Sequence, residues 1–261
     1  MVELGAGRIG GTAPLWEEMG IHLAVESILA GATKAPMFVD DAEAPAAAMT
    51  WTGHRLFLAG DVAGAGFGGA LAGFASSRGQ FVAYCTRDDL EGAERLLSGY
   101  KVEKRWRRYY ECDPSVRGWA GDPPEGYAVE RITLELLGRG LGHTDWVREE
   151  MCSERASVEE FLGKSFGFAA LHGGGFAAWC MSEYNLGDRC EVGIETVREH
   201  RRRGLAVLVD GAMFRHAAAT GVRRVGWHCW ADNAGSVATA ERLGLRHVVD
   251  YTALFIDART G

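Results

Sequence analysis

Residues 189–206 read RCEVGIETVREHRRRGLA, and this stretch decides how the C-terminal half of the chain folds. Its polar and apolar side chains alternate in a way that predicts a strand over residues 189–196. An apolar stripe at helical spacing then predicts a helix over residues 204–219. The junction carries three consecutive arginines followed by Gly204. Because the first N–H groups of a helix lack intrahelical partners and its dipole is positive there, this junction is suited to a pyrophosphate.

The elements around this junction predict an α/β domain. Patterning predicts strands at 127–137, 166–171, 176–182, 223–229 and 245–256, with helices at 145–155, 158–164 and 234–243. Ser157 and Glu160 form a capping-box pattern at the start of one helix. The stretch DPSVRGWAGDPPEG at 113–126 has the composition of a linker. We therefore expect an N-terminal domain over residues 1–122 and a second domain over 123–261.

The N-terminal half is predicted to be a smaller α/β region. Helical patterns cover 14–31 and 87–97, and short extended runs cover 37–39, 55–59 and 81–85. Two glycine patterns, GAGRIG at 5–10 and GAGFGG at 64–69, raise the alternative of a dinucleotide site. The first follows too short a segment for a buried strand, and the second lacks a continuing helix and an acidic residue. We interpret both patterns as flexible loops.

Composition limits the classes of partner. The chain of 261 residues has a net charge of −7, so it offers no general attraction for nucleic acid. Its six cysteines show no paired spacing typical of zinc sites, and we expect no metal. We find no signal-peptide pattern and no apolar run long enough to span a membrane. These features predict a cytoplasmic protein without membrane or nucleic-acid partners.

Two motifs resemble the GNAT superfamily of acyl-CoA N-acyltransferases. RRRGLA at 201–206 matches the superfamily signature Gln/Arg-x-x-Gly-x-Gly/Ala. WHCWADNAGSVATAERLGL at 227–245 resembles its second motif through Asn233, Ser236, Leu243 and Gly244, with Leu245 in the usual place of Phe. Together with Tyr251 in the last strand and the run at 36–61, these motifs resemble the zwittermicin A resistance type of GNAT acetyltransferase.

The resemblance implies a GNAT fold, in which helices flank a mixed central sheet and two strands splay apart to admit pantetheine. It also implies that the N-terminal domain lines the acceptor cleft, with a degenerate copy of the GNAT fold as its expected form. Acetyl-CoA would be the cosubstrate. The implied cofactor-binding residues are Ile194, Glu195 and Thr196 for pantetheine, Arg201, Arg202, Arg203, Gly204, Leu205 and Ala206 for pyrophosphate, and Asn233 and Ser236 beside them.

The implied activity is direct transfer of acetyl from acetyl-CoA to an amine of a small molecule, for which an antibiotic is one candidate. No covalent enzyme intermediate is required, and a homodimer is compatible with this activity. A longer acyl group is one alternative. Another is a module that binds CoA as a sensor or scaffold without turnover. The acceptor itself is not defined by any motif.

Catalysis needs a base for the amine and an acid for the departing thiolate. Glu183, Glu191 and Glu195 are the candidate bases, although each carboxylate is equally well explained as a polar strand residue or an arginine partner. Counting from Asn233, the Tyr that often serves as the acid in GNAT enzymes is replaced by Ala240. Tyr251 or solvent would then protonate the thiolate.

Overall fold

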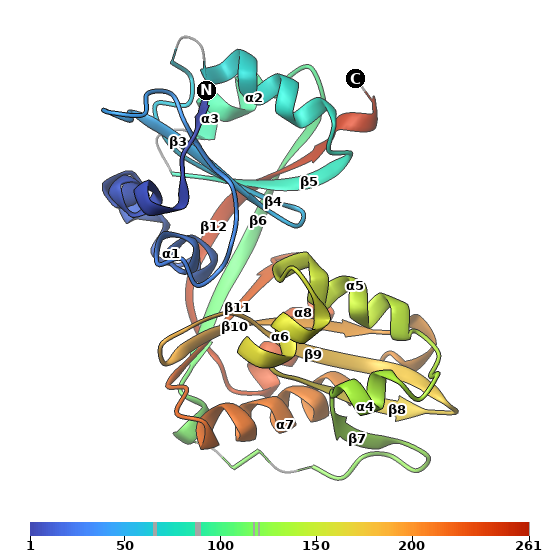
Figure 1. Ribbon diagram of the computed structural model, residues 1–261. Helices are drawn as coiled ribbons and strands as arrows, with labels where there is room; N and C mark the ends of the chain where they lie inside the picture. The colour runs from blue at the N-terminus through green and yellow to red at the C-terminus, as the bar shows by residue number, and fades with distance from the viewer. Residues whose placement is uncertain (65–66, 87–89, 117, 120, 261) are drawn as a thin grey trace. The chain divides into compact units, whose positions relative to one another are not determined.

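The chain forms two compact units (Figure 1). The computed structural model describes residues 1–64, 67–86, 90–116, 118–119 and 121–260. Unit 1 comprises Met1–Arg107 and Asp250–Gly261, and unit 2 comprises Arg108–Val249. The chain therefore leaves unit 1 within strand β6 (Lys101–Cys112) and returns to it within β12 (Arg246–Asp257).

This division differs from the predicted boundary at residue 122. The proline-containing stretch begins inside unit 2, where the Pro114 carbonyl accepts a hydrogen bond from Trp119 Nε1 at 2.7 Å. Its composition marks an irregular backbone, whereas a domain boundary falls where few contacts cross. The change of unit occurs instead within β6, whose sequence KVEKRWRRYYEC carries no linker signal.

Unit 1 is an α/β unit whose sheet has the order β1-β2-β3-β4-β5-β12. Its own strands are β1 (Val2–Glu3), β2 (Met37–Val39), β3 (Ala47–Thr52), β4 (Arg55–Gly60) and β5 (Gln80–Cys85). Its helices are η1 (Ala6–Met19), α1 (Leu23–Leu29), α2 (Phe67–Ser76), α3 (Leu90–Leu96) and η5 (Ala258–Thr260). Leu56, Phe67 and Leu254 belong to one core formed by the sheet, α2 and α3. The predicted role of this unit in lining an acceptor cleft stays a prediction.

Several sequence interpretations in unit 1 are corrected. Residues 6–10 of the GAGRIG pattern lie in the 3-10 helix η1, so the loop interpretation is wrong there. The helical pattern over 14–31 is divided between η1 and α1. Strands β3 and β6 were not predicted, and the charged pattern of β6 explains the second omission. In the other glycine pattern, residues 65–66 lie outside the described residues, and those from Phe67 begin α2, so the expectations of a loop there and of no continuing helix are wrong.

Unit 2 contains a mixed sheet in the order β6-β11-β10-β9-β8-β7. Its further strands are β7 (Ala128–Arg131), β8 (Gly167–His172), β9 (Gly175–Leu186), β10 (Arg189–Thr196) and β11 (Arg224–Trp230). Its helices are η3 (Pro114–Val116), α4 (Leu134–Leu137), α5 (Thr144–Glu154), α6 (Val158–Lys164), η4 (Arg198–His200), α7 (Leu205–Ala219) and α8 (Ala234–Arg242). Strands β7 to β10 are successive antiparallel neighbours, and β10 pairs in parallel with β11.

Helices cover both faces of this sheet (Figure 1). On the α5 face, Trp179 and Met181 of β9 pack with Met151 of α5. On the α7 face, Cys180 packs with Met213 of α7. The alternating side chains of β9 explain this division, since neighbours along a strand point to opposite faces. The predicted α/β class with a mixed, helix-flanked sheet is confirmed.

Most predicted elements of unit 2 are present, with one clear exception. The strand predicted over 127–137 ends at Arg131, and α4 follows it. Thr133 explains the change because its side chain accepts a hydrogen bond from the Leu136 N–H and so caps α4. Across the described ranges, the helices are too short or too polar to cross a bilayer.

Candidate cofactor cleft and active site

Strands β10 and β11 pair over only part of their length. Their parallel register runs through Arg189↔Arg224, Cys190↔Val225 and Glu191↔Gly226 and ends there. Strand β10 nevertheless continues to Thr196, and β11 continues to Trp230. The two strands therefore continue past the last residue pair of their shared register. This is the splayed arrangement that the sequence resemblance predicted.

A cleft of about 550 Å³ lies beside this splay, where α7 begins. Gly204 precedes α7 with a φ of 78°, a left-handed conformation that glycine adopts without steric cost. Arg202, two residues earlier, also has a positive φ, of 62°. The residues Leu205, Ala206 and Val207 follow in the first turn of α7 and line the cleft. The cleft therefore faces the unpaired N–H groups and positive dipole end of a 15-residue helix, next to arginine side chains.

The structure brings the predicted cofactor residues together, with one exception. Those that line the cleft are Ile194, Glu195, Thr196, Arg201, Arg202, Gly204, Leu205, Ala206, Asn233 and Ser236. Arg203 is exposed and is not among the described lining residues. Sequence reasoning missed the remaining lining residues, His200, Val207, Trp227, Gly235, Ala238, Thr239 and Arg242. Thr239 and Arg242 follow Ser236 at helical spacing on α8, a signal that could have identified them.

Arg201 is fixed against the end of β10. Its Nε donates to the Thr196 carbonyl at 2.9 Å, and its Nη2 lies 3.3 Å from Glu195 Oε1. The same Glu195 oxygen accepts the Thr196 N–H at 2.8 Å. Glu195 is thus engaged by an arginine of the cleft, which is the structural role considered for it as an alternative to catalysis.

Asn233 and Ser236 form the start of α8. Asn233 Oδ1 accepts the Ser236 N–H at 3.1 Å and caps the helix. Ser236 Oγ in turn accepts a hydrogen bond from Trp227 Nε1 at 3.1 Å. Trp227 is almost fully buried and reaches the cleft from β11. The residues that cap α8 therefore also line the cleft, and a hydrogen bond joins them to Trp227.

His200 lies in the cleft beside a small aromatic cluster. Tyr127 Oη and His200 Nδ1 share a hydrogen bond of 2.8 Å, and the Tyr127 ring stacks on His172 at 4.3 Å between centroids. Burial lowers the pKa of His200, and the neighbouring His172 and Arg203 lower it further. His200 is therefore favoured in its neutral form, as a hydrogen-bonding group of the cleft.

Glu183 and Glu191 lie side by side on the α5 face. They are directly opposite each other on β9 and β10, and each is only 8% exposed. Glu191 Oε1 is 3.4 Å from His228 Nε2, and the His228 ring stacks on Tyr109 at 4.6 Å. Burial, with the Glu191 charge beside it, raises the pKa of Tyr109 well above its usual range, so its phenol stays protonated. All three predicted bases therefore belong to the α5 face, since Glu195 is paired with Trp179, but only Glu183 and Glu191 lie directly side by side.

The candidate acids have different surroundings. Ala240, at the position of the frequent tyrosine, is fully buried in the core beneath α8. Tyr251 belongs to unit 1, where its ring packs against His22 at 5.3 Å and lies 6.3 Å from Tyr84. It is not among the described residues that line the cleft. Its role as an acid stays a prediction.

Cys180 is unsuited to act as a nucleophile. It is fully buried on the α7 face, near the buried carboxyl of Asp210. Burial raises the pKa of the Cys180 thiol well above its usual range, with Asp210 as a further cause. Burial likewise raises the pKa of Asp210 well above its usual range. A protonated, inaccessible thiol does not attack a thioester.

The family model for GNAT acetyltransferase matches residues 14–254. The chain therefore belongs to the GNAT acetyltransferase family, and the match extends across both units.

Individual relatives agree with this assignment. The chain is 26% identical over 236 residues to YdfB of Bacillus subtilis, an uncharacterized N-acetyltransferase, covering 88% of this chain and 89% of that protein. Its fold resembles a GCN5-related N-acetyltransferase-like protein from Streptococcus suis, with a TM-score of 0.78, 22% identity and coverage of 97% and 100%. It also resembles a tandem GNAT protein from the clavulanic acid biosynthesis pathway, solved without AcCoA, with a TM-score of 0.56, 16% identity and 98% coverage of each chain.

Proposed function

We propose that this protein transfers an acetyl group from acetyl-CoA to an amine of a small molecule. The observation that carries the proposal is the cleft where α7 begins, beside the segments of β10 and β11 that continue past their shared register. A pantetheine arm needs a narrow path lined by backbone groups, and a pyrophosphate needs N–H groups and positive charge. This cleft offers both within unit 2.

The cofactor would be held in three segments. The N–H groups of Gly204 to Val207, with Arg201 and Arg202, would bind the pyrophosphate. The backbone of residues 194–196 would bind pantetheine and hold the thioester carbonyl, stabilising the oxyanion that forms during attack. Ser236 and Arg242 of α8 would close the opposite wall of the cleft.

The chemistry would be a direct attack in a ternary complex. The amine nitrogen forms a bond to the thioester carbon, the carbon–sulfur bond breaks, and the amine loses a proton to a base. We assign the base to Glu183, with Glu191 held beside it by His228. Water in the cleft protonates the departing thiolate. The inaccessible Cys180 thiol supports this route over one through an acyl-cysteine.

The acceptor would be a cationic small molecule. Glu183 and Glu191 supply negative charge on the α5 face, which favours an amine that arrives protonated. The sequence resemblance to zwittermicin A resistance type acetyltransferases supports an amine-bearing antibiotic as the acceptor class. In that case the physiological role would be self-protection by acetylation.

A thiol-release assay tests this proposal. Purified protein is given acetyl-CoA and a panel of primary amines that includes polyamines and aminated antibiotics, and free CoA is measured against a no-amine control. Calorimetry on the same preparation measures acetyl-CoA binding. The proposal predicts micromolar binding and release of thiol with at least one amine, together with a product heavier by one acetyl group. Binding without thiol release for every amine would instead support a CoA sensor or scaffold.

A further inference from the structure

Strand β9 contains an extra residue immediately beside Glu183. The register with β10 passes from Arg189↔Leu186 to Glu191↔Glu183, so three steps on β9 oppose two steps on β10. Tyr184 lies in this bulge and has a φ of 52°, in the left-handed region that non-glycine residues rarely adopt. The bulge determines which side chain of β9 faces Glu191. Without it, the residues beyond the bulge would exchange faces of the sheet.

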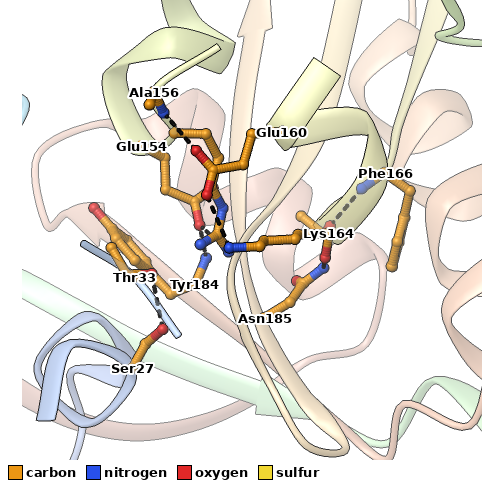
Figure 2. Close-up of polar contacts among 11 residues, drawn as sticks. Ser27, Thr33, Glu154, Ala156, Glu160, Lys164, Phe166, Tyr184 and Asn185 are labelled. Carbon is orange, nitrogen blue, oxygen red and sulfur yellow. Dashed lines mark hydrogen bonds and ion pairs between the residues drawn. The ribbon is translucent and has the colours of Figure 1, made fainter. Parts of the chain in front are cut away.

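A buried carboxylate holds the bulge in place (Figure 2). Glu154, at the end of α5, accepts the Tyr184 N–H at 2.7 Å, and the same oxygen is 2.9 Å from Arg155 Nη2. Both side chains of this ion pair are almost fully buried. On the other side of Glu183, Ser182 Oγ accepts hydrogen bonds from the Phe166 N–H and from Asn185 Nδ2. The backbone is therefore anchored on both sides of Glu183.

Gly193 provides the space that the Glu183 carboxylate occupies. A Cβ atom built on Gly193 would lie 2.4 Å from Glu183 Oε1 and 3.0 Å from its carboxyl carbon. The same Cβ would lie 3.3 Å from Glu150 Oε1. The first distance is shorter than any ordinary contact, so a side chain at this position must displace the carboxylate. Gly193 precedes Ile194, which lines the cofactor cleft. The Glu183 carboxylate thus lies against β10 close to the point where the pairing of β10 with β11 ends.

We propose that Gly193 and Glu154 are positioning residues for Glu183, one by leaving space for its carboxylate and the other by fixing the bulge that orients it. This inference rests on the proposed function, in which Glu183 is the base. Neither residue needs to touch the substrates. Displacing a base by about 1 Å from its productive position can lower the rate by about 100-fold, so loss of either residue should act on turnover.

A double-mutant cycle tests the role of Gly193. Glu183→Gln should lower kcat for acetyl transfer by about 100-fold. Gly193→Ala should lower kcat at least about tenfold, while the Kd for acetyl-CoA changes less than about twofold. In the Glu183→Gln background, Gly193→Ala should lower kcat only slightly further, because the side chain it displaces no longer acts as a base. Gly163→Ala is the matched control, since a Cβ there meets nothing within 4 Å.

The possible outcomes distinguish failure of the positioning role, of the base assignment and of the proposed function. Equal losses from Gly193→Ala in both backgrounds would overturn the positioning role, because the glycine would then act independently of Glu183. An unchanged kcat in Glu183→Gln would remove the base assignment on which the inference rests. Failure of the wild-type protein to release thiol with any amine would instead reject the proposed function.

Paired variants test the role of Glu154. Glu154→Gln keeps an oxygen that can accept the Tyr184 N–H, whereas Glu154→Ala does not. Both leave Arg155 without its carboxylate and should lower the melting temperature. At a temperature where circular dichroism shows both folded, kcat should fall at least about fivefold more in Glu154→Ala than in Glu154→Gln. This difference should disappear in the Glu183→Gln background. Equal kcat values for the two variants would overturn the role of Glu154.

Discussion

The two faces of strand β10 are built in different ways. On the α7 face, Ile194 borders a cleft that is also lined by the start of α7 and by Arg201 and Arg202. On the α5 face, Glu183 and Glu191 present carboxylates whose positions depend on strand pairing. One face is suited to a constant ligand with phosphates, and the other to proton transfer and a particular acceptor. Changes on the first face should therefore affect cofactor binding, and changes on the second should affect turnover.

The largest expected effect distinguishes the carboxylates of β9 and β10. Glu183→Gln should lower kcat by about 100-fold with acetyl-CoA affinity preserved, because the amide cannot accept the proton. Glu195→Gln should have a much smaller effect on kcat, since Glu195 is paired with Arg201 at the end of the strand. Steady-state kinetics of both variants with one amine provide the comparison. Equal losses of kcat would contradict the assignment of the base to Glu183.

The next effect compares Arg201 with Arg203, two arginines of the same loop before α7. Arg201→Gln should raise the Kd for acetyl-CoA about tenfold, because Arg201 lines the cleft and is fixed against Thr196. Arg203→Gln should change it less than about threefold, because Arg203 is not among the described residues that line the cleft and contributes only a screened charge. Calorimetry at low and physiological salt measures both. A larger loss from Arg203→Gln would show that the phosphates bind outside this cleft.

A stability effect is expected from the buried carboxyl of Asp210 in helix α7. Because burial raises the pKa of Asp210 above 3.8, the unfolded state releases this proton at lower pH than the folded state. The contribution to the free energy of unfolding is therefore complete at acidic pH and is lost as pH rises toward the folded pKa. Asp210→Asn should remove this loss and raise the free energy of unfolding by about 1 kcal/mol or more at pH 7.5.

Urea denaturation between pH 5 and pH 8 measures this change. The wild-type free energy of unfolding should fall with pH more steeply than that of Asp210→Asn. Asp122→Asn, at an exposed position, controls for the change in net charge. Parallel pH dependence in wild type and Asp210→Asn would contradict a protonated Asp210.

The smallest expected effect concerns the wall of the cleft. Trp227→Phe removes the hydrogen bond to Ser236 Oγ but keeps most of the buried ring. Such a bond is worth about 1 kcal/mol, so the KM for acetyl-CoA should rise no more than about fivefold while kcat is unchanged. Steady-state kinetics with varied acetyl-CoA measure this. A large fall in kcat would show that Trp227 affects the reacting groups on the other face.

The same contrast explains how much could be predicted from sequence. The cofactor face depends on a local pattern, in which a strand, the RRRG loop and a helix follow one another, so its residues could be named in advance. Thr239 and Arg242 lie within the second motif, but they were missed because only Asn233 and Ser236 of that motif were assigned to the cofactor. The family assignment was also within reach of sequence, because both motifs occur in the expected order.

The other face could be predicted only in part. Glu183 and Glu191 were candidates, but their side-by-side position depends on a bulge at Tyr184, a residue that gives no turn signal. Gly193 acquires its importance from a side chain ten residues earlier in the chain. The unit boundary was misplaced for a related reason, since it depends on which strands share contacts and not on local composition.

A crystal structure of the complex with acetyl-CoA tests the central claim most directly. It should place the pyrophosphate within hydrogen-bonding distance of the N–H groups of Gly204 to Val207, with the arm passing between β10 and β11. The thioester should then lie beside Gly193, with its carbonyl carbon accessible from the side where the Glu183 carboxylate lies. Phosphates bound elsewhere, or a thioester shielded from Glu183 by the sheet, would contradict the division of β10 into a cofactor face and a catalytic face.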